Sequence, residues 1–462
     1  LEVKIILKKM QYFKPEGEYF AGDCMPFYEG GVFHLFYLLD KNHHQANHGL
    51  GGHQWAHLST RNLIEWTNHE VAIKPEADWE ASICTGSLIF YKGLYHAFYA
   101  VRKPDRTQHI CHAFSKDCIS FQKSKFNPIL SAPLISFKED FRDPFIFRDS
   151  SGEFNMIITS NLRKPLLNKR GGCLLRYTSS DLMEWKESGL FLIPGKKQQY
   201  SGIPECPDIF QMNNYFYLLF GQGLETHYRI SQNPLGPWYE PENDLLASSL
   251  CAVMKTAAFG TNRRIGVCWI GTRKENKDNG PLEWGGNVVF REIQQNSDGT
   301  LSTSFIEELI PKGKVIFPAT NIHSAETVEE KGELILNACN TTQAVSFNGL
   351  PLNFRVFCEI KLNDCKSFAF GIRGIGTLEK SYEITFDIGR RQISLEGQVI
   401  YISDDLKEKL VVEIIAKESL IDVCVNKKYT IINRLYELNG DSLFLFCYNG
   451  RLSLKNLKIY AI

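Results

Sequence analysis

The sequence predicts an all-β protein, a five-bladed β-propeller followed by a C-terminal β-sandwich. Three observations favour this fold class. The apolar segments are rich in β-branched and aromatic residues, and helical periodicity is nearly absent. A strand–turn–strand pattern recurs along the first part of the chain. A second, polar turn recurs between its copies.

The main repeat is a short polar or acidic start, an apolar run, a turn and an aromatic run. Successive copies start roughly 50 to 65 residues apart, at Gly22, Cys84, Arg142, Glu205 and, more weakly, Lys255. Turn residues stand where each hairpin must reverse, as in Glu29-Gly30-Gly31, Lys92-Gly93, Ser150-Ser151-Gly152 and Asn213-Asn214. Each copy therefore predicts a β-hairpin.

The second pattern is a polar start followed by an aromatic anchor. It ends at Trp66, Phe121, Trp185 and Trp238. A hairpin, a third strand, this turn and a fourth strand make a unit typical of a propeller blade. A series of sandwiches or a β-solenoid is the alternative, but solenoid repeats are shorter and a sandwich would not repeat this turn.

The pattern changes after Pro311, where Pro and Gly residues indicate a linker. We expect the propeller domain to cover residues 1–315. Alternating strands without the blade pattern follow, so we expect a β-sandwich domain over residues 325–462.

Composition argues against several classes of partner. Lys+Arg and Asp+Glu both number 52, so nothing steers the chain towards nucleic acid. No apolar run is long enough to span a membrane, and no signal peptide is visible at the start. Cysteines within apolar strands indicate buried free thiols and a reducing, cytoplasmic compartment, namely Cys268, Cys358, Cys424 and Cys447.

Three acidic residues stand near the starts of separate copies: Asp23, Asp143 and Glu205. The first strand of each blade lines the central channel of a propeller, so these side chains should meet at one mouth. We place Asp23 and Glu205 at equivalent positions, and Asp143 two residues away on the same face. Glycosidic bond cleavage needs such carboxylates: one protonated acid, one ionised nucleophile and one that holds sugar hydroxyls.

A divalent metal site is the rival interpretation of the three acids, and we expect no metal and no cofactor. The histidine-rich stretch from His43 to His57 has no spacing of known mechanics, and it is either a flexible loop or a contributor to substrate or metal binding. Trp55, Trp79 and Trp284 are candidates for stacking on sugar faces, whereas the tryptophans of the repeated turn are packing anchors.

At these residues the chain resembles glycoside hydrolase family 32, which includes invertases, inulinases and levanases. Arg142-Asp143-Pro144 is similar to the family's Arg-Asp-Pro motif, and Glu205-Cys206-Pro207-Asp208 to its Glu-Cys motif. Three further segments resemble family motifs, starting at Trp55, Thr85 and Trp284. The C-terminal part is similar to the family's appended β-sandwich.

The resemblance implies roles for these residues. Asp23 is the nucleophile, Glu205 the acid/base, and Asp143 the stabiliser of the transition state. Substrate contacts are implied for Arg142, Trp55, Thr85, Ser87, Asp40, Cys206 and Trp284. The first motif departs from the family, because Gly22 stands where the family has Asn, and Leu39-Asp40-Lys41-Asn42 stands where it has Gln.

We therefore expect a retaining glycoside hydrolase that cleaves β-fructofuranosides, such as sucrose or a fructan, through a covalent fructosyl-enzyme. The partner is a small carbohydrate, with no nucleic acid or membrane. Three alternatives remain open from the sequence: a fructosyltransferase, an arabinan-type furanosidase and a non-catalytic carbohydrate-binding propeller. Linkage preference and oligomeric state do not follow from the sequence.

Overall fold

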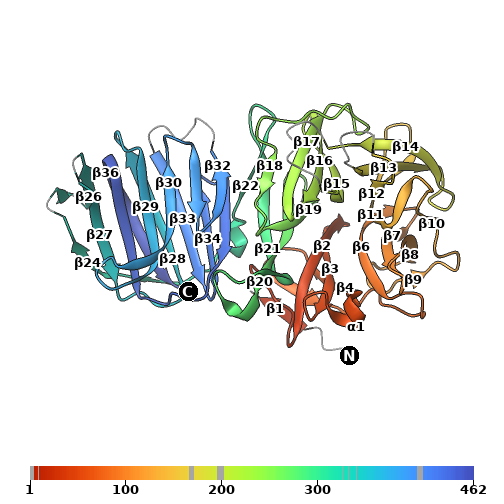
Figure 1. Cartoon of the computed structure of the whole chain (residues 1–462), viewed down its shortest axis with the longest axis horizontal. Helices are drawn as coiled ribbons and strands as arrows, with labels where there is room; N and C mark the ends of the chain where they lie inside the picture. The colour runs from red at the N-terminus through yellow and green to blue at the C-terminus, as the bar shows by residue number, and fades with distance from the viewer. Residues whose placement is uncertain are drawn as a thin grey trace. The chain divides into compact units, whose positions relative to one another are not determined.

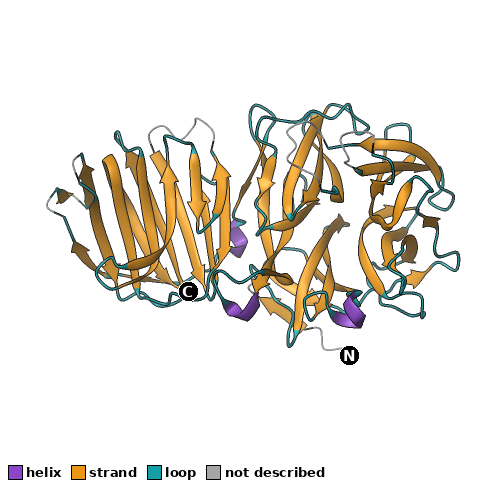
Figure 2. Ribbon diagram, in the orientation of Figure 1, coloured by secondary structure: helices purple, strands orange, loops and turns teal. Residues whose placement is uncertain are grey.

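A computed structural model describes residues 5–8, 10–165, 171–194, 202–324, 326–330, 332–339, 341–402 and 409–462. Strands dominate this part of the chain, and the helices are single short turns (Figure 2). The chain divides into two compact units, unit 1 (residues 1–271 and 283–301) and unit 2 (residues 272–282 and 302–462). The first unit thus ends before the expected boundary at 315, and a short stretch of the fifth repeat belongs to unit 2.

Unit 1 is a succession of antiparallel sheets that follow the sequence repeats (Figure 1). The sheet of the first repeat contains β2 (Tyr19–Glu29), β3 (Val32–Lys41), β4 (Gln54–Thr60) and β5 (Glu65–Asn68), with β1 (Ile5–Lys8) at its edge. The second repeat forms β6 (Ser82–Tyr91), β7 (Leu94–Arg102), β8 (Gln108–Ser115), β9 (Gln122–Lys123) and β10 (Leu130–Ser131). The helix α1 (Ala46–Gly49) lies between β3 and β4.

The third repeat forms β11 (Ser136–Arg148), β12 (Phe154–Leu162), β13 (Gly172–Ser179) and β14 (Lys186–Leu192). The fourth forms β15 (Glu205–Met212), β16 (Tyr215–Gln222), β17 (Glu225–Ser231) and β18 (Leu245–Ala247). The last repeat forms β19 (Ala252–Phe259), β20 (Arg263–Arg273) and β21 (Leu282–Gln295), and β22 (Leu301–Ser304) pairs with β21. Because β2 pairs with β21 at Ala21 and Gly286, the first and last repeats form one nine-stranded sheet.

The first strands of successive repeats contact one another in a closed circuit. β2 contacts β6, β6 contacts β11, β11 contacts β15, β15 contacts β19, and β19 contacts β2. Buried apolar side chains fill the space between neighbouring sheets, for example Phe98 of β7 and Phe141 of β11 in one cluster. This closure is typical of a β-propeller, because each sheet packs face to face on the next around a common axis.

The predicted turns have the expected local chemistry. Gly30 and Gly31 have φ angles of 57° and 76°, and they join the paired residues Glu29 and Val32. Two consecutive residues in the left-handed region form a tight hairpin turn that suits the twist of the strands. In the second repeated pattern, side-chain oxygens of Asn62, Asp117, Asp181 and Asn233 accept hydrogen bonds from backbone N–H groups two residues later.

Unit 2 contains two sheets that share one long strand, β36 (Ser442–Ala461). The first half of β36 pairs with β27 (Gln343–Asn348) and β29 (Ser367–Ile375), and the second half with β26 (Glu333–Ala338) and β28 (Phe354–Leu362). Leu445 and Leu454, from the two halves, belong to one buried core. Two sheets around one core form a sandwich.

The other strands of unit 2 complete the two sheets. They are β23 (Lys314–Ile316), β24 (Ala319–Ile322), β25 (Thr327–Glu330), β30 (Lys380–Asp387), β31 (Gln392–Leu395), β32 (Gln398–Tyr401), β33 (Lys409–Lys417), β34 (Leu420–Val425) and β35 (Tyr429–Arg434). Two 3₁₀ turns, Lys274–Asn276 and Glu307–Leu309, also belong to this unit.

Candidate active site

Every first strand of the unit 1 repeats has an irregularity at the same place. The pairing with its hairpin partner shifts between Ala21 and Cys24, Ile83 and Gly86, Arg142 and Phe145, Glu205 and Asp208, and Ala252 and Lys255. Asp143, Cys206 and Val253 occupy the same position within their bulges, and their φ angles are 55°, 51° and 51°. A bulge with a left-handed residue turns the adjacent side chains out of the regular alternation.

This register corrects one expectation from the sequence. We predicted that Asp23 and Glu205 occupy equivalent positions, and this is wrong. Glu205 is the last paired residue before its bulge, Asp143 is the first residue inside its bulge, and Asp23 is the second residue inside its bulge. The bulges, and not the two-residue period of a strand, bring the three acids together.

Asp23 accepts hydrogen bonds from two other repeats. The hydroxyl of Thr85 donates to its Oδ2 at 2.7 Å, and the indole N–H of Trp269 donates to its Oδ1 at 2.9 Å. The thiol of Cys206 also points at Oδ2, with the sulfur 3.7 Å away. Donors on both oxygens fix the orientation of this carboxylate.

Asp143 is buried, with an exposed fraction of 3%, whereas Asp23 and Glu205 are half-buried. The backbone N–H of Cys206 donates to its Oδ2 at 3.1 Å, and Nε of Arg142 lies 3.7 Å from the same oxygen. Burial raises the pKa of Asp143 to about 6; Arg142 opposes this rise, and the charges of Glu205 and Asp23 add to it. The influence of both acids on Asp143 shows that the three carboxylates share one electrostatic environment.

Arg142 forms an ion pair with Glu205 and links it to Asp143. Its Nη2 donates to Oε1 of Glu205 at 2.8 Å, and its Nη1 donates to Asp140 at 2.8 Å. Burial alone would lower the pKa of Arg142, but its ion pairs with Glu205 and Asp143 outweigh burial and raise it. The side chain of Glu205 is 35% exposed, so solvent reaches this acid.

Thr85 and Ser87 both lie on β6, and only Thr85 contacts an acid. The Ser87 hydroxyl donates to the carbonyl of Pro144 at 2.9 Å and accepts the N–H of Ile146. Ser87 therefore ties β6 to the strand that carries Asp143.

We expected Trp55 to stack on a sugar, but the structure buries it completely. Its exposed fraction is 0%, and its indole N–H donates to the carbonyl of Cys84 at 2.9 Å. Both faces are covered, so in this structure Trp55 packs between sheets and no sugar reaches it.

Asp40 and Trp284 form a second group beside the acids. Asp40 is fully buried, and its Oδ1 accepts from His53 Nε2 and from the backbone N–H of His44, each at 2.9 Å. The ring of Trp284 stacks on His53 with centroids 4.6 Å apart. A Cβ atom added at Gly22 would lie 2.0 Å from the ring of Trp284, so only glycine fits beside Asp23 here.

Trp269 is a site residue that was not predicted from the sequence. Its ring lies 5.2 Å from that of Trp284, and it donates directly to Asp23. It lies on the second strand of the weakest repeat, within Val267-Cys268-Trp269-Ile270, and an apolar run of this kind carries no signal of a site residue.

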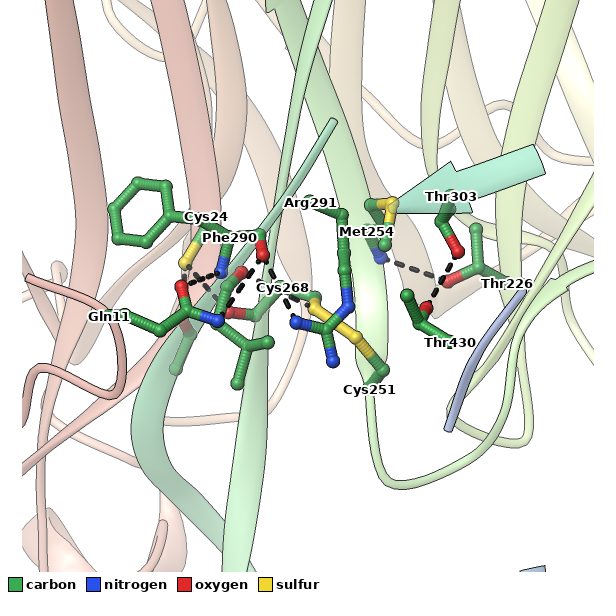
Figure 3. The surroundings of a disulfide bond; sticks show 12 residues. Gln11, Cys24, Thr226, Cys251, Met254, Cys268, Phe290, Arg291, Thr303 and Thr430 are labelled. Carbon is green, nitrogen blue, oxygen red and sulfur yellow. Dashed lines mark hydrogen bonds between the residues drawn. A yellow bond between two sulfur atoms is a disulfide. The ribbon is translucent and has the colours of Figure 1, made fainter. Parts of the chain in front are cut away.

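One of the four cysteines predicted to be free thiols is instead disulfide-bonded. Cys268 forms a disulfide with Cys251, whereas Cys358, Cys424 and Cys447 are free as expected. Cys268 lies on β20 and Cys251 directly precedes β19, and these adjacent strands bring the two Cα atoms within 5.7 Å. Figure 3 shows the disulfide next to the buried side chain of Arg291.

A pocket of about 450 Å³ adjoins Glu205. It is lined by Arg142, Asn161, Gly171, Gly172, Gly202, Ile203, Glu205 and Gly223. Its position on the exposed side of Glu205 leaves room for a ligand next to the acid.

Within the described residues, no group of three His, Cys, Asp or Glu side chains has the arrangement of a metal site. The histidines of the loop before β4 have other partners, since His44 accepts from Arg102 at 2.9 Å and His53 binds Asp40. No helix in the described ranges is long and apolar enough to cross a membrane.

Carboxylates that converge at the centre of a closed circuit of sheets, with a ligand-sized pocket beside them, are typical of glycoside hydrolases. The model of the glycosyl hydrolases family 32 N-terminal domain matches residues 12–303. The chain therefore belongs to glycosyl hydrolase family 32.

Curated relatives agree with this assignment. A levanase of Bacillus subtilis is 28% identical over 214 residues, which cover 44% of this chain and 28% of the levanase. A sucrose-6-phosphate hydrolase of the same organism is 28% identical over 211 residues, covering 43% of this chain and 40% of that protein. An insoluble β-fructofuranosidase, isoenzyme 5 of Oryza sativa subsp. japonica, is 25% identical over 285 residues, covering 59% and 48%. The chain thus spans less than half the length of each of these relatives.

Solved structures share the fold over nearly the whole chain. Fructan 1-exohydrolase IIa from Cichorium intybus superposes with a TM-score of 0.71 at 16% identity, covering 97% of this chain and 96% of that chain. An exo-inulinase from Aspergillus awamori gives a TM-score of 0.71 at 16% identity, with 98% of each chain covered.

Proposed function

We propose that the chain is a retaining β-fructofuranosidase built on a five-bladed propeller. The observation that carries the proposal is the convergence of Asp23, Asp143 and Glu205 from three separate sheets, joined through Arg142 and Cys206. The names of the relatives, which include a levanase, a sucrose-6-phosphate hydrolase and a β-fructofuranosidase, support a fructoside as substrate.

In this proposal Asp23 is the nucleophile. Its two oxygens accept from Thr85 and Trp269, which holds the ionised carboxylate in one orientation for attack on the anomeric carbon of a fructosyl unit. The bond to the leaving oxygen breaks as the ester bond to Asp23 forms, and water later cleaves the ester.

Glu205 is the acid/base. It protonates the leaving oxygen in the first step and removes a proton from water in the second. Its partial exposure and the adjoining pocket support this role, because the proton must exchange with solvent and the leaving group needs space. Arg142 orients Glu205 between these steps.

Asp143 stabilises the transition state. Its buried carboxylate, held by the amide of Cys206, is placed to accept sugar hydroxyls as positive charge develops on the ring. A charge in such a water-poor site acts more strongly than it would in solvent.

The test is sugar release from sucrose, inulin-type and levan-type oligosaccharides. We expect free fructose from at least one of them, and no release by Asp23→Asn, which keeps the shape of the side chain but removes its charge. Asp105→Asn is the matched control, because Asp105 is exposed and contacts only its local turn. Equal rates for Asp23→Asn and wild type would overturn the proposal.

A further inference from the structure

Lys255 has a buried ammonium group next to the segment that follows Glu205. The residue is 3% exposed and directly follows the bulge of β19. Its Nζ donates to the carbonyl of Pro207 at 2.8 Å and lies 5.2 Å from the centre of the Phe145 ring. Burial of an ammonium group is costly unless it has partners, and here the carbonyl of Pro207 and the ring of Phe145 are those partners.

The partner of Lys255 belongs to the bulge that carries Glu205. Within this bulge Cys206 has a φ of 51° and its N–H donates to Asp143, while Pro207 offers only its carbonyl. The next residue, Asp208, is also held from β19, since the N–H and hydroxyl of Thr256 donate to its Oδ2 at 2.8 and 2.6 Å.

Lys255 and Thr256 therefore clamp the segment after Glu205 from the neighbouring sheet. The left-handed conformation of Cys206 costs energy for a residue other than glycine, and it persists only where neighbouring contacts enforce it. The ion–dipole bond from Lys255 to Pro207 is such a contact, and charge-assisted hydrogen bonds are the stronger ones.

We propose that Lys255 is a positioning residue for the acid/base. By holding the carbonyl of Pro207 it fixes the bulge that aims Glu205 at the leaving group and the Cys206 amide at Asp143. This inference rests on the proposed function, because it assigns Glu205 the task of protonating a leaving oxygen.

The test compares two substrates for Lys255→Met. Sucrose has a leaving group that needs protonation, whereas the nitrophenolate of p-nitrophenyl β-D-fructofuranoside leaves with little help. We expect kcat/KM for sucrose to fall roughly 100-fold and kcat/KM for the aryl substrate, which reports only formation of the ester, to fall less than about tenfold. Lys255→Arg keeps the charge and should recover part of the loss on sucrose.

Lys123→Met is the matched control. Lys123 also donates to a backbone carbonyl, that of Lys74 at 2.7 Å, and pairs with Glu80, but it lies outside the group of acids. Both substrates should be turned over normally by this variant.

Equal losses on both substrates, or no loss on either, would overturn the role of Lys255. If Lys255→Met does not fold, Lys255→Arg alone decides, since a misplaced acid must still slow sucrose more than the aryl substrate. A wild-type chain inactive on the aryl substrate, on sucrose and on inulin-type and levan-type oligosaccharides would instead refute the proposed function itself.

Discussion

Asp143 is the residue where burial and catalysis conflict most clearly. Its pKa of about 6 in the folded chain lies above the ordinary value of 3.8. The folded state therefore retains a proton that the unfolded state has lost, and stability falls as the pH rises through about 6. An ionised Asp143 weakens the fold at neutral pH.

Asp143→Asn should remove this cost. We expect the free energy of unfolding of the variant to exceed that of wild type by roughly 1–3 kcal/mol above pH 6, and the two to converge below about pH 4. Activity should fall sharply at the same time, because the amide carries no charge. Urea denaturation from pH 4 to 8 measures the effect, and a variant less stable than wild type at pH 7.5 would contradict it.

At the residue scale the sequence predicted the acids better than the aromatic residues. Asp23, Asp143, Glu205 and Arg142 lie in motifs whose chemistry is specific, and the structure brings them together. Trp55 and Trp269 show why aromatic residues were harder to assign. Both lie in apolar strands, and only the packing of the sheets decides which one faces an acid.

Two hydrogen-bonded pairs of histidines recur at the same place in neighbouring sheets. His34 and His57 share a hydrogen bond of 3.0 Å across β3 and β4, and His96 and His112 share one of 3.0 Å across β7 and β8. Burial lowers all four pKa values, that of His34 to about 4 and that of His112 to about 3. These pairs stabilise the fold only while they are neutral.

The expected consequence is acid lability of unit 1. Because the folded pKa values lie below the ordinary 6.5, stability is complete above about pH 6.5 and is lost as the pH falls towards 4 and 3. His112→Gln keeps a hydrogen-bonding side chain that does not titrate, so it should reduce the loss by at most about 1.4 kcal/mol per pH unit. Chemical denaturation at pH 7.5, 5.5 and 4.5 checks this, with the exposed His48→Gln as control. An unchanged pH slope in His112→Gln would refute it.

The disulfide between Cys251 and Cys268 connects two adjacent strands of the last repeat over a sequence separation of 17. Closing a loop of this size is worth about 3 kcal/mol in the chain-entropy account. Cys251→Ser/Cys268→Ser should therefore unfold at lower urea, whereas Cys339→Ser, at an exposed free thiol, should not. Alkylation without reductant should leave Cys251 and Cys268 unlabelled; labelling of both in unreduced protein would contradict the assignment.

At the element scale the hairpins and the repeated turns followed from sequence, but the bulges did not. A bulge needs only one extra residue and has no composition of its own, as Gly22-Asp23 and Val253-Met254 show. The alignment by apolar pattern alone therefore placed Asp23 and Glu205 in the wrong relative register.

At the scale of the whole molecule the sequence predicted an all-β chain, and this is confirmed. The structure divides the chain at Leu301, before the Pro-Gly segment that we took for the linker, and assigns residues 272–282 to unit 2. The pattern of strands in the sequence cannot reveal that residues 272–282 belong to unit 2, because this assignment depends on packing between distant segments.

The most direct test of the account is to trap the fructosyl-enzyme. Glu205→Gln, treated with p-nitrophenyl β-D-fructofuranoside, should form the ester quickly and hydrolyse it slowly, because the base for the second step is missing. Mass spectrometry should then show the added mass of one fructosyl residue on the peptide that contains Asp23. An adduct on another carboxylate, or inverted fructose as the first product of the wild-type chain, would contradict the account.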